Sequence, residues 1–358
     1  MSENASKTQQ LTPAERRAQA IRITAPGTSL RVALDMILAG HLGALICVGD
    51  EQAVLASGGD GFPLDISFTA NRLFELAKMD GAIVVDGDLN TILRANFHLS
   101  PDPGIPTSET GMRHRTASRM SLLTGATVIS ISQRRQVINV YVDGRPIELR
   151  TVSDLMVVVN RLLVTLQQAR QTLDRYLLHL STLELDGYVT LADITNVFSN
   201  FEILLMADAE LQDCVLQLGS EGRTVELQRE QFTRGMDEDY TLMVRDYAAD
   251  SSQENAESIR TRLHEMARKH QFQSSRRVAE ALGYPDLDED SVMAPLGLRT
   301  LARVSVVRDG MAEKIVDEYG SLQEVVNDMV RNPERLDDLG VNNPDVLVAT
   351  LNRMMTTS

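Results

Sequence analysis

The sequence predicts an α/β domain with a mixed sheet, followed by an all-α middle region and a C-terminal region of short helices. Three observations support this order. β-branched runs alternate with helical stretches up to residue 150, leucines recur at helical spacing from residue 151, and Gly and Pro interrupt short helices from residue 284. A chain of 358 residues is too long for one ordinary core. We therefore expect three regions, 14–150, 151–283 and 284–358.

The first region alternates between predicted strands and helices. Helical spacing predicts helices over Ser29–Ala39 and Thr69–Met79. The predicted strands are Ala44–Val48, Ala82–Val85, Ile92–Phe97, Val128–Ile131 and Val137–Val142. Asp143-Gly144 follows the last of these strands and predicts a type I′ hairpin turn, because this turn needs the positive φ angles that Asp-Gly tolerates.

The second region begins with one long amphipathic helix. Its apolar stripe consists of Leu155, Val158, Leu162, Leu166, Ala169, Leu173, Tyr176, Leu177 and Leu180. Thr151 and Asp154 are placed to form a capping box at its start. Further helices are predicted over Leu191–Leu218 and Glu254–His270, and no catalytic cluster is found among them. The region is interpreted as a helical spacer or bundle.

The third region predicts a helix-hairpin-helix unit, with helices near Leu296–Val304 and Met311–Tyr319. A weaker second repeat runs from Leu336-Asp337-Asp338 to Met354, and its hairpin has Asn342 where a second glycine is usual. Such hairpins bind DNA phosphates through backbone N–H groups at a helix N-terminus. From residue 284 onward there are fourteen acidic and seven basic side chains, which argues against strong affinity for duplex DNA.

Two short motifs carry the chemistry of the first region. Asp80-Gly81-Ala82 follows one predicted helix, and Met112-Arg113-His114-Arg115-Thr116 opens another. A carboxylate holds a divalent ion and accepts a hydroxyl proton, whereas arginines present planar forks that match phosphate oxygens. The glycine lets a nucleotide approach the backbone closely. Together the motifs predict a site for a metal ion and a triphosphate.

Each motif has a simpler interpretation when it is taken alone. Asp80-Gly81 is an ordinary turn dipeptide, and Arg113-His114-Arg115 is typical of a solvated helix start. Gly58-Gly59-Asp60-Gly61 is interpreted as a turn, because it lacks the Gly-Lys-Ser/Thr ending of a phosphate loop. Arg134 and Arg135 follow a strand, where an exposed charged edge is expected more often than a phosphate or subunit contact.

Four blocks of sequence, in the same order, resemble the diadenylate cyclase domain of the DNA integrity scanning protein DisA family. These blocks are Lys78–Val85, Arg94–Leu99, Gly111–Arg119 and Val128–Arg135. The resemblance extends through the helical middle to the tail. It implies an enzyme that condenses two ATP molecules into cyclic di-AMP and releases two pyrophosphates. It also implies that two cyclase domains meet face to face to share the reaction, since one domain cannot easily face itself.

The resemblance implies a role for each residue of the motifs. Asp80 would hold Mg²⁺ or Mn²⁺ and help to deprotonate or orient the 3′-hydroxyl, and Gly81 would offer a backbone contact. Leu99 would meet the adenine through its main chain. The triphosphate would be held by Met112, Arg113, His114, Arg115 and Thr116. Met112 offers only its backbone where many cyclase domains carry threonine.

The resemblance further implies a homo-octamer and a tail that binds branched DNA, such as Holliday junctions, and thereby lowers cyclase output. The candidate phosphate donors in the tail are Arg299, Arg303, Arg308 and Lys314. Two other functions remain open. One is a DNA-binding scanning module whose nucleotide site only senses ATP, and the other is transfer of a different nucleotide. Asp80 favours an enzyme, because a pure sensor has no need for a proton acceptor.

Composition excludes several classes of protein. The net charge of −15 argues against a protein that coats nucleic acid, and aromatic residues make up only 4% of the chain. Cys47 and Cys214 lie far apart in apolar contexts, which indicates reduced thiols. Residues 1–10 are polar without a signal-peptide pattern, and no apolar run approaches the ~18 residues of a membrane span. We therefore expect a cytoplasmic protein without a membrane anchor.

Overall fold

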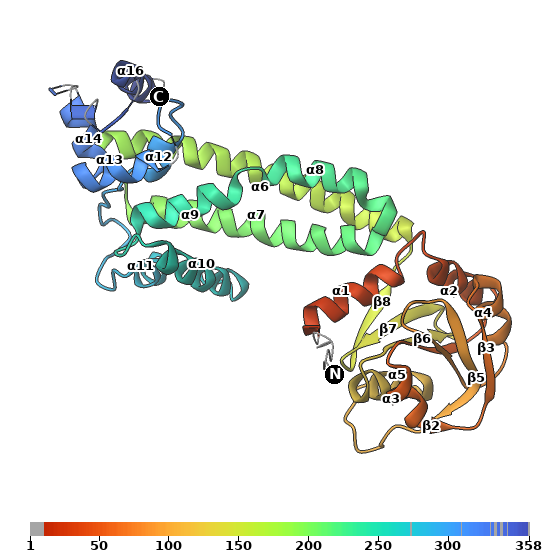
Figure 1. Cartoon of the computed structure of the whole chain (residues 1–358). Coiled ribbons are helices and arrows are strands. Elements are labelled where there is room, and N and C mark those ends of the chain that lie inside the picture. The colour runs from red at the N-terminus through yellow and green to blue at the C-terminus, as the bar shows by residue number, and fades with distance from the viewer. Residues whose placement is uncertain are drawn as a thin grey trace, which may run out of the picture. The chain divides into compact units, whose positions relative to one another are not determined.

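The computed structural model describes residues 11–272, 274–308, 310–329, 331–332, 335–336, 339–341 and 343–356 (Figure 1). The chain divides into two compact units. The first comprises Met1–Asn160 and Gln212–Glu226, and the second comprises Arg161–Leu211 and Leu227–Ser358. Each unit is described by itself below.

The first unit contains an eight-stranded mixed sheet. Its strands are β1 (Ala44–Val48), β2 (Gly58–Gly59), β3 (Phe62–Ser67), β4 (Ala82–Val85), β5 (Thr91–Leu99), β6 (Thr127–Ser132), β7 (Val137–Val142) and β8 (Arg145–Leu149). Their order is β2-β5-β4-β1-β6-β7-β8, and β3 also pairs with β5. Only β1 and β4 run parallel among these pairs. The predicted α/β layer with a mixed sheet is confirmed.

Helices cover both faces of this sheet. The helices of the first region are α1 (Pro13–Ile23), α2 (Ser29–Ala39), α3 (Glu51–Ala56), α4 (Ala70–Leu76) and α5 (Met112–Leu123). Side chains of β1 alternate between two cores, as expected for a strand covered on both sides. Ile46 packs with α2 and α4, whereas Cys47 packs with α3 and α5.

The hairpin between β7 and β8 turns at the predicted dipeptide. Asp143 and Gly144 have φ angles of 50° and 77°, and Val142 pairs with Arg145 across the turn. These positive angles fit the predicted type I′ geometry. The turn also binds α5, because the Gly144 carbonyl accepts from Ser118 Oγ and the Gly144 N–H donates to Ser121 Oγ. The hairpin thereby fixes the position of the helix that carries the second motif.

The remaining helices begin with a single helix of 35 residues, α6. They are α6 (Val152–Asp186), α7 (Leu191–Leu218), η1 (Gly219–Gly222), α8 (Arg223–Thr233), α9 (Met236–Tyr247), α10 (Gln253–Arg268), α11 (Ser275–Leu282), α12 (Leu298–Ala302), α13 (Met311–Tyr319), α14 (Leu322–Met329) and α16 (Pro344–Thr356). At the start of α6, Thr151 Oγ1 accepts from the Asp154 N–H and donates to the Asp154 carboxylate. The predicted long helix is therefore confirmed.

A buried polar network joins α6, α9 and α12 within the second unit. Arg299 Nη2 donates to Glu184 Oε2 at 2.7 Å, and both side chains are completely buried. Asp246 accepts the N–H groups of Gly297, Leu298 and Arg299 and so caps the short helix α12. A charge buried in this way is stable only with its partner, so the network locks α12 against the end of α6.

The tail has the short helices α12 and α13 near the positions predicted for the first hairpin. Their apolar side chains share a core with Leu185 of α6. For the second repeat, Asp337, Asp338 and Asn342 lie outside the described residues, as do residues 1–10 of the polar N-terminus.

Candidate functional site

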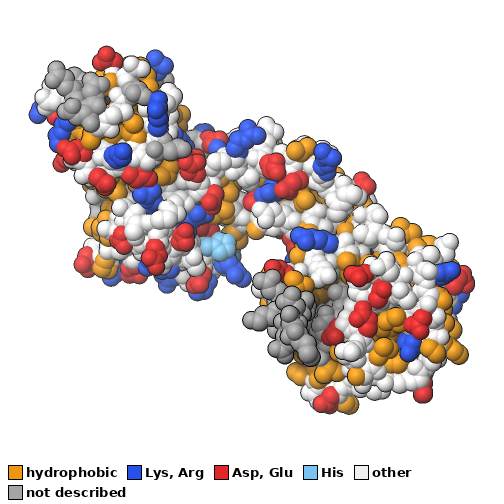
Figure 2. Space-filling model, viewed as in Figure 1, with side chains coloured by type: hydrophobic (Ala, Val, Ile, Leu, Met, Phe, Trp, Pro, Cys, Tyr) orange, Lys and Arg blue, Asp and Glu red, His pale blue; other side chains and the backbone are white. Residues whose placement is uncertain are grey.

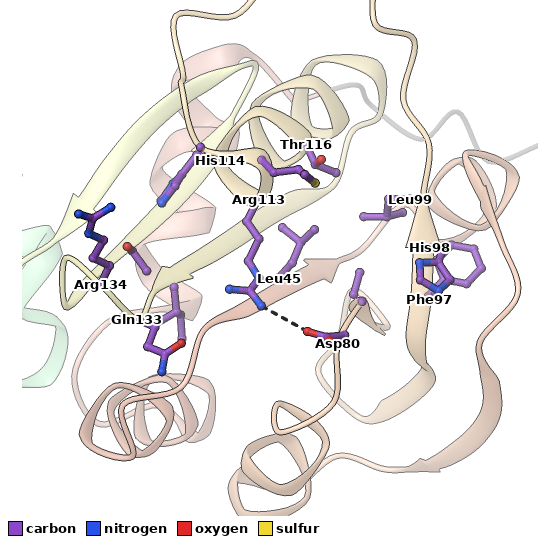
Figure 3. Close-up of a pocket in the computed structure, with 16 residues that line it drawn as sticks. Leu45, Asp80, Phe97, His98, Leu99, Arg113, His114, Thr116, Gln133 and Arg134 are labelled. Carbon is purple, nitrogen blue, oxygen red and sulfur yellow. Dashed lines mark ion pairs between the residues drawn. The ribbon is translucent and has the colours of Figure 1, made fainter.

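A pocket of about 770 Å³ lies at the edge of the sheet where β1 and β4 begin and β6 ends (Figure 3). Both predicted motifs contribute to its wall. The lining residues are Leu45, Asp80, Gly81, Ala82, Phe97, His98, Leu99, Gly111, Met112, Arg113, His114, Thr116, Ile131, Ser132, Gln133 and Arg134. This volume is within the range of small-molecule sites.

Asp80 and Gly81 lie in the turn that leads into β4. Gly81 has a φ of 87°, and a Cβ there would lie 2.8 Å from the carbonyl carbon of Asn96. Only glycine fits this left-handed backbone position so close to the neighbouring strand. Asn96 Nδ2 donates to the Asp80 carbonyl at 2.8 Å. The Asp80 side chain is 95% exposed, so its carboxylate is open to a metal ion or a hydroxyl group.

Arg113 reaches the same space from the start of α5. Its Nη2 lies 3.7 Å from Oδ1 of Asp80. A Cβ at Gly43 would collide with Arg113 Nη1, so the small residue at position 43 leaves room for the guanidinium. Gly111 caps α5 without a side-chain hydrogen bond, and the first turn of the helix contains no acidic residue. The guanidinium and the free N–H groups of this helix end together favour an anion.

His114 lies on the buried side of α5 and still lines the pocket. Its Nδ1 is 2.9 Å from the Tyr141 hydroxyl. Burial is the main cause that lowers the pKa of His114. Arg135 and Arg113 lower it further, while Glu109 opposes them. The imidazole therefore favours its neutral form until another negative charge comes near.

The pocket gathers most of the predicted site residues. Seven of them line it, namely Asp80, Gly81, Leu99, Met112, Arg113, His114 and Thr116. Arg115 is exposed and does not line the pocket. Ser118 and Arg119, which continue the second motif, have structural contacts. Arg119 donates to the carbonyls of Ile105 and Pro103 and so holds the loop before α5.

Ser132 and Gln133 were not predicted as site residues, and a phosphate contact was the less expected interpretation of Arg134, yet the end of β6 and the turn after it bring all three to the pocket. Arg134 is exposed, as expected for a charged strand edge, and it also borders the site. The available signal was that Ser132, Gln133 and Arg134 lie within the fourth resembling block, Val128–Arg135. The local sequence of one strand does not predict which other strand ends lie beside it, because that depends on how the strands pair in the sheet.

The four predicted DNA donors have different environments. Arg299 is completely buried against Glu184, so its prediction as a phosphate donor is wrong for this fold. Arg303 pairs with Asp239 at 3.1 Å. Arg308 and Lys314 are exposed. On the face shown in Figure 2, acidic and basic side chains are interspersed over the tail that the structure describes.

Comparisons with known proteins agree with this site. Residues 31–146 match the family model described as DisA bacterial checkpoint controller nucleotide-binding, and residues 149–290 match the DisA bacterial checkpoint controller linker region. A DNA integrity scanning protein DisA from Symbiobacterium thermophilum is 40% identical over 90% of each chain. The chain belongs to the DNA integrity scanning protein DisA family.

Other DisA relatives cover the chain equally well. The relative from Kineococcus radiotolerans is 37% identical over 97% of both chains. The relative from Streptomyces avermitilis is 38% identical over 88% of this chain and 86% of its own. The resemblance to this family is therefore confirmed. The matched domain is the diadenylate cyclase domain, and the protein is a nucleotidyltransferase that converts ATP to cyclic di-AMP.

The described residues also bear on the expected membrane topology and metal site. No helix in that part of the chain has the length and apolar character needed to cross a membrane. Within the same residues, no group of three or more His, Cys, Asp and Glu side chains is arranged to hold a metal ion.

Proposed function

We propose that the pocket binds one ATP and that two such pockets, facing each other across a two-fold axis, complete one active site. The observation that carries this proposal is the meeting of Asp80, Arg113 and the N-terminus of α5 in one pocket. Each ATP must present its 3′-hydroxyl to the α-phosphorus of the other, in line with the leaving pyrophosphate. Catalysis then depends mainly on positioning and charge neutralisation.

The residues of the pocket divide this work. Arg113, His114 and the N–H groups at the start of α5, including that of Met112, bind the triphosphate. Thr116 lies one turn further along the pocket wall. Asp80 accepts or orients the 3′-hydroxyl proton with its exposed carboxylate. The backbone of Gly81 and the main chain of Leu99 border the nucleoside. Arg115 lies outside the pocket, which leaves it free to act at the facing domain.

A divalent cation, Mg²⁺ or Mn²⁺, fits this pocket if the ATP phosphates supply most of its ligands. Asp80 is a single carboxylate, and the described residues offer no larger acidic group around it. Mg²⁺ is commonly bound through one or two carboxylates together with substrate phosphates. When bound, the ion neutralises charge on the phosphates. We therefore propose that Asp80 and the ATP phosphates hold it jointly.

The competing function, a nucleotide site that only senses ATP, is less consistent with Asp80. An arginine and a helix N-terminus would strengthen ATP binding in a sensor. An exposed carboxylate beside the phosphates would weaken it by repulsion, unless that carboxylate binds a metal ion or accepts a proton. Incubation of the purified protein with ATP and Mn²⁺, followed by chromatography, tests the proposal. Cyclic di-AMP and pyrophosphate are expected in a ratio of one to two, and unchanged ATP would favour the sensor.

For the rest of the chain we propose three regions, 14–150, 151–283 and 284–358, an octameric assembly and a cytoplasmic location. Cys47 and Cys214 are buried and are not disulfide-bonded, which supports a reducing compartment. The tail is proposed to act as a helix-hairpin-helix unit that senses branched DNA and regulates the cyclase. Its exposed donors are Arg308, Lys314 and Arg303, of which Arg303 pairs with Asp239, whereas Arg299 serves the internal network.

A further inference from the structure

A buried tyrosine lies directly behind the histidine of the pocket. Tyr141 in β7 is 0% exposed, and its hydroxyl lies 2.9 Å from Nδ1 of His114. The ring packs in the core between α5 and the sheet. A hydroxyl in such a place is costly unless it is hydrogen-bonded, so the apolar core alone does not explain a tyrosine here.

Glu109 is the acidic residue that acts on this pair from behind. Burial is the main cause that raises the pKa of Tyr141, and the negative charge of the nearby Glu109 carboxylate, an acceptor for the Tyr141 hydroxyl, raises it further. The segment that carries Glu109 is fixed to α5. The Glu109 N–H donates to Thr107 Oγ1, and Thr107 Oγ1 donates to Ser118 Oγ. Glu109 is therefore held near the hydroxyl by the helix that also carries His114.

Counting the available protons indicates which group donates in the hydrogen bond between Tyr141 and His114. A tyrosine hydroxyl has one proton, and a carboxylate can only accept. If Tyr141 donates to Glu109, its oxygen accepts from the Nδ1–H of His114. That assignment leaves Nε2 as the second ring nitrogen, and Nε2 has no hydrogen-bond partner among the described residues. Because His114 lines the pocket, Nε2 is the nitrogen available to a ligand.

We propose that Tyr141, backed by Glu109, is a positioning residue that orients the His114 imidazole so that Nε2 meets the triphosphate. The inference rests on the proposed role of His114 as a phosphate ligand. When the triphosphate enters, its negative charge favours a proton from solvent on Nε2. The imidazolium then donates to a phosphate oxygen, and the Glu109–Tyr141 pair stabilises it from behind, as a carboxylate does in catalytic triads.

The charges around His114 agree with this role. Arg113 and Arg135 disfavour the protonated ring, and Glu109 is the negative charge that opposes them. Without Glu109, the bound phosphates would be the main negative charge that favours protonation of His114, against the effects of burial and of the two arginines. The arrangement keeps the imidazole neutral in the free enzyme and lets it become charged when ATP is present.

Tyr141→Phe tests the inference, because it removes the hydroxyl and keeps the ring in the core. We expect the KM for ATP to rise about 3- to 10-fold, the range that corresponds to loss of one hydrogen bond. Tyr240→Phe is the matched control. It also removes a buried hydroxyl, one that donates to Glu202 at 2.6 Å in the second unit. The control should lower the unfolding temperature similarly and leave the KM unchanged.

Glu109→Gln provides a second variant that does not disturb the core, since Glu109 is only half-buried. Removing this negative charge lowers the pKa of His114. The protonated form is then lost at a lower pH, so the alkaline limb of the KM profile should move to lower pH. An unchanged KM and pH profile in both Tyr141→Phe and Glu109→Gln would overturn the inference.

A double-variant comparison separates this inference from the proposed function. Tyr141→Phe should have little further effect in a His114→Ala background, because its action passes through the imidazole. An equal effect in both backgrounds would show that Tyr141 acts only on the structure and would overturn the inference alone. If His114→Ala itself leaves the KM unchanged, the proposed phosphate role of His114 fails instead.

Discussion

Nη2 of Arg113 lies 3.7 Å from Oδ1 of Asp80, although the two residues come from separate motifs. Their side chains are 43% and 95% exposed, so this ion pair contributes little to stability. Each group can therefore exchange its partner at low cost, the arginine for a phosphate and the carboxylate for a cation. One bound nucleotide can therefore contact both the phosphate-binding arginine and the cation-binding carboxylate.

Asp80→Asn is expected to abolish cyclisation while ATP binding largely persists. The amide keeps the shape of the side chain but loses the charge that holds a metal ion and orients the hydroxyl. Product chromatography and calorimetry with ATP measure the two properties separately. Full turnover by the purified variant would refute the role of Asp80.

Arg113→Ala is expected to weaken ATP binding about tenfold, because it removes a charge-assisted contact to phosphate. Arg115→Ala is the matched comparison, since it removes the same charge two residues away and outside the pocket. Its effect on ATP binding by one protomer should be smaller. Equal losses would show that both arginines contact the same triphosphate. No loss of ATP binding in the variant that carries both substitutions would contradict phosphate binding by Arg113.

Gly43→Ala is expected to displace the Arg113 guanidinium, because the new Cβ would collide with Nη1. The colliding atom is the end of a flexible side chain, so the fold should persist while ATP affinity falls. Gly59→Ala is the control, since a Cβ there meets nothing within 4 Å. Calorimetry with ATP checks both variants. An unaffected Gly43→Ala would mean that the guanidinium binds phosphate from another position.

A shared active site predicts that activity per protomer falls on dilution, once the concentration drops below the dissociation constant of the interface. A monomer should be inactive. Light scattering combined with product chromatography across a dilution series tests this expectation. A monomer that makes cyclic di-AMP would remove the face-to-face mechanism.

DNA binding by the tail is expected to be weak, salt-sensitive and selective for junctions over linear duplex, because several tails of one oligomer can contact a junction together. Arg308→Ala with Lys314→Ala should weaken binding and spare the cyclase. Mobility shifts with a four-way junction at low and high salt measure this. Tight binding that ignores salt would contradict the prediction.

Arg299→Ala serves as the contrasting variant for the tail. It leaves Glu184 buried without its partner, so we expect a loss of about 3–5 kcal/mol in stability rather than a selective loss of DNA binding. For the same reason, deleting all residues after Tyr284 is a poor test of the tail, since it removes Arg299 and the helix that Asp246 caps.

Much of the fold could be predicted from local patterns. β1, β4, β7, α2 and α7 match the predicted ranges, because each has a clear apolar period or a β-branched run. The short strands β2 and β3 were not predicted. β2 is the dipeptide Gly58-Gly59, for which the sequence predicts a turn, because two glycines have no side chains to form a strand pattern. β3 pairs with β5 through a register shift near Pro63.

The site was predictable where one segment carries its chemistry. Both motifs can be recognised from their residue types, their order and their resemblance to the cyclase domain, and the pocket unites them with the exception of Arg115. Arg299 was misassigned because a basic residue in a polar tail resembles a surface donor, and only the tertiary fold places it against Glu184. The contacts of Tyr141 were equally invisible, since a tyrosine in a strand of apolar residues has no sign of a polar partner.

The pairing of Glu184 with Arg299 constrains how this chain can evolve. A neutral substitution at either position would leave the other as an isolated charge in a dry interior, so a single change is selected against even though neither residue lies at the pocket. Replacement requires two coordinated changes, for example to a well-packed apolar pair. Among homologues we therefore expect positions 184 and 299 to vary together or not at all.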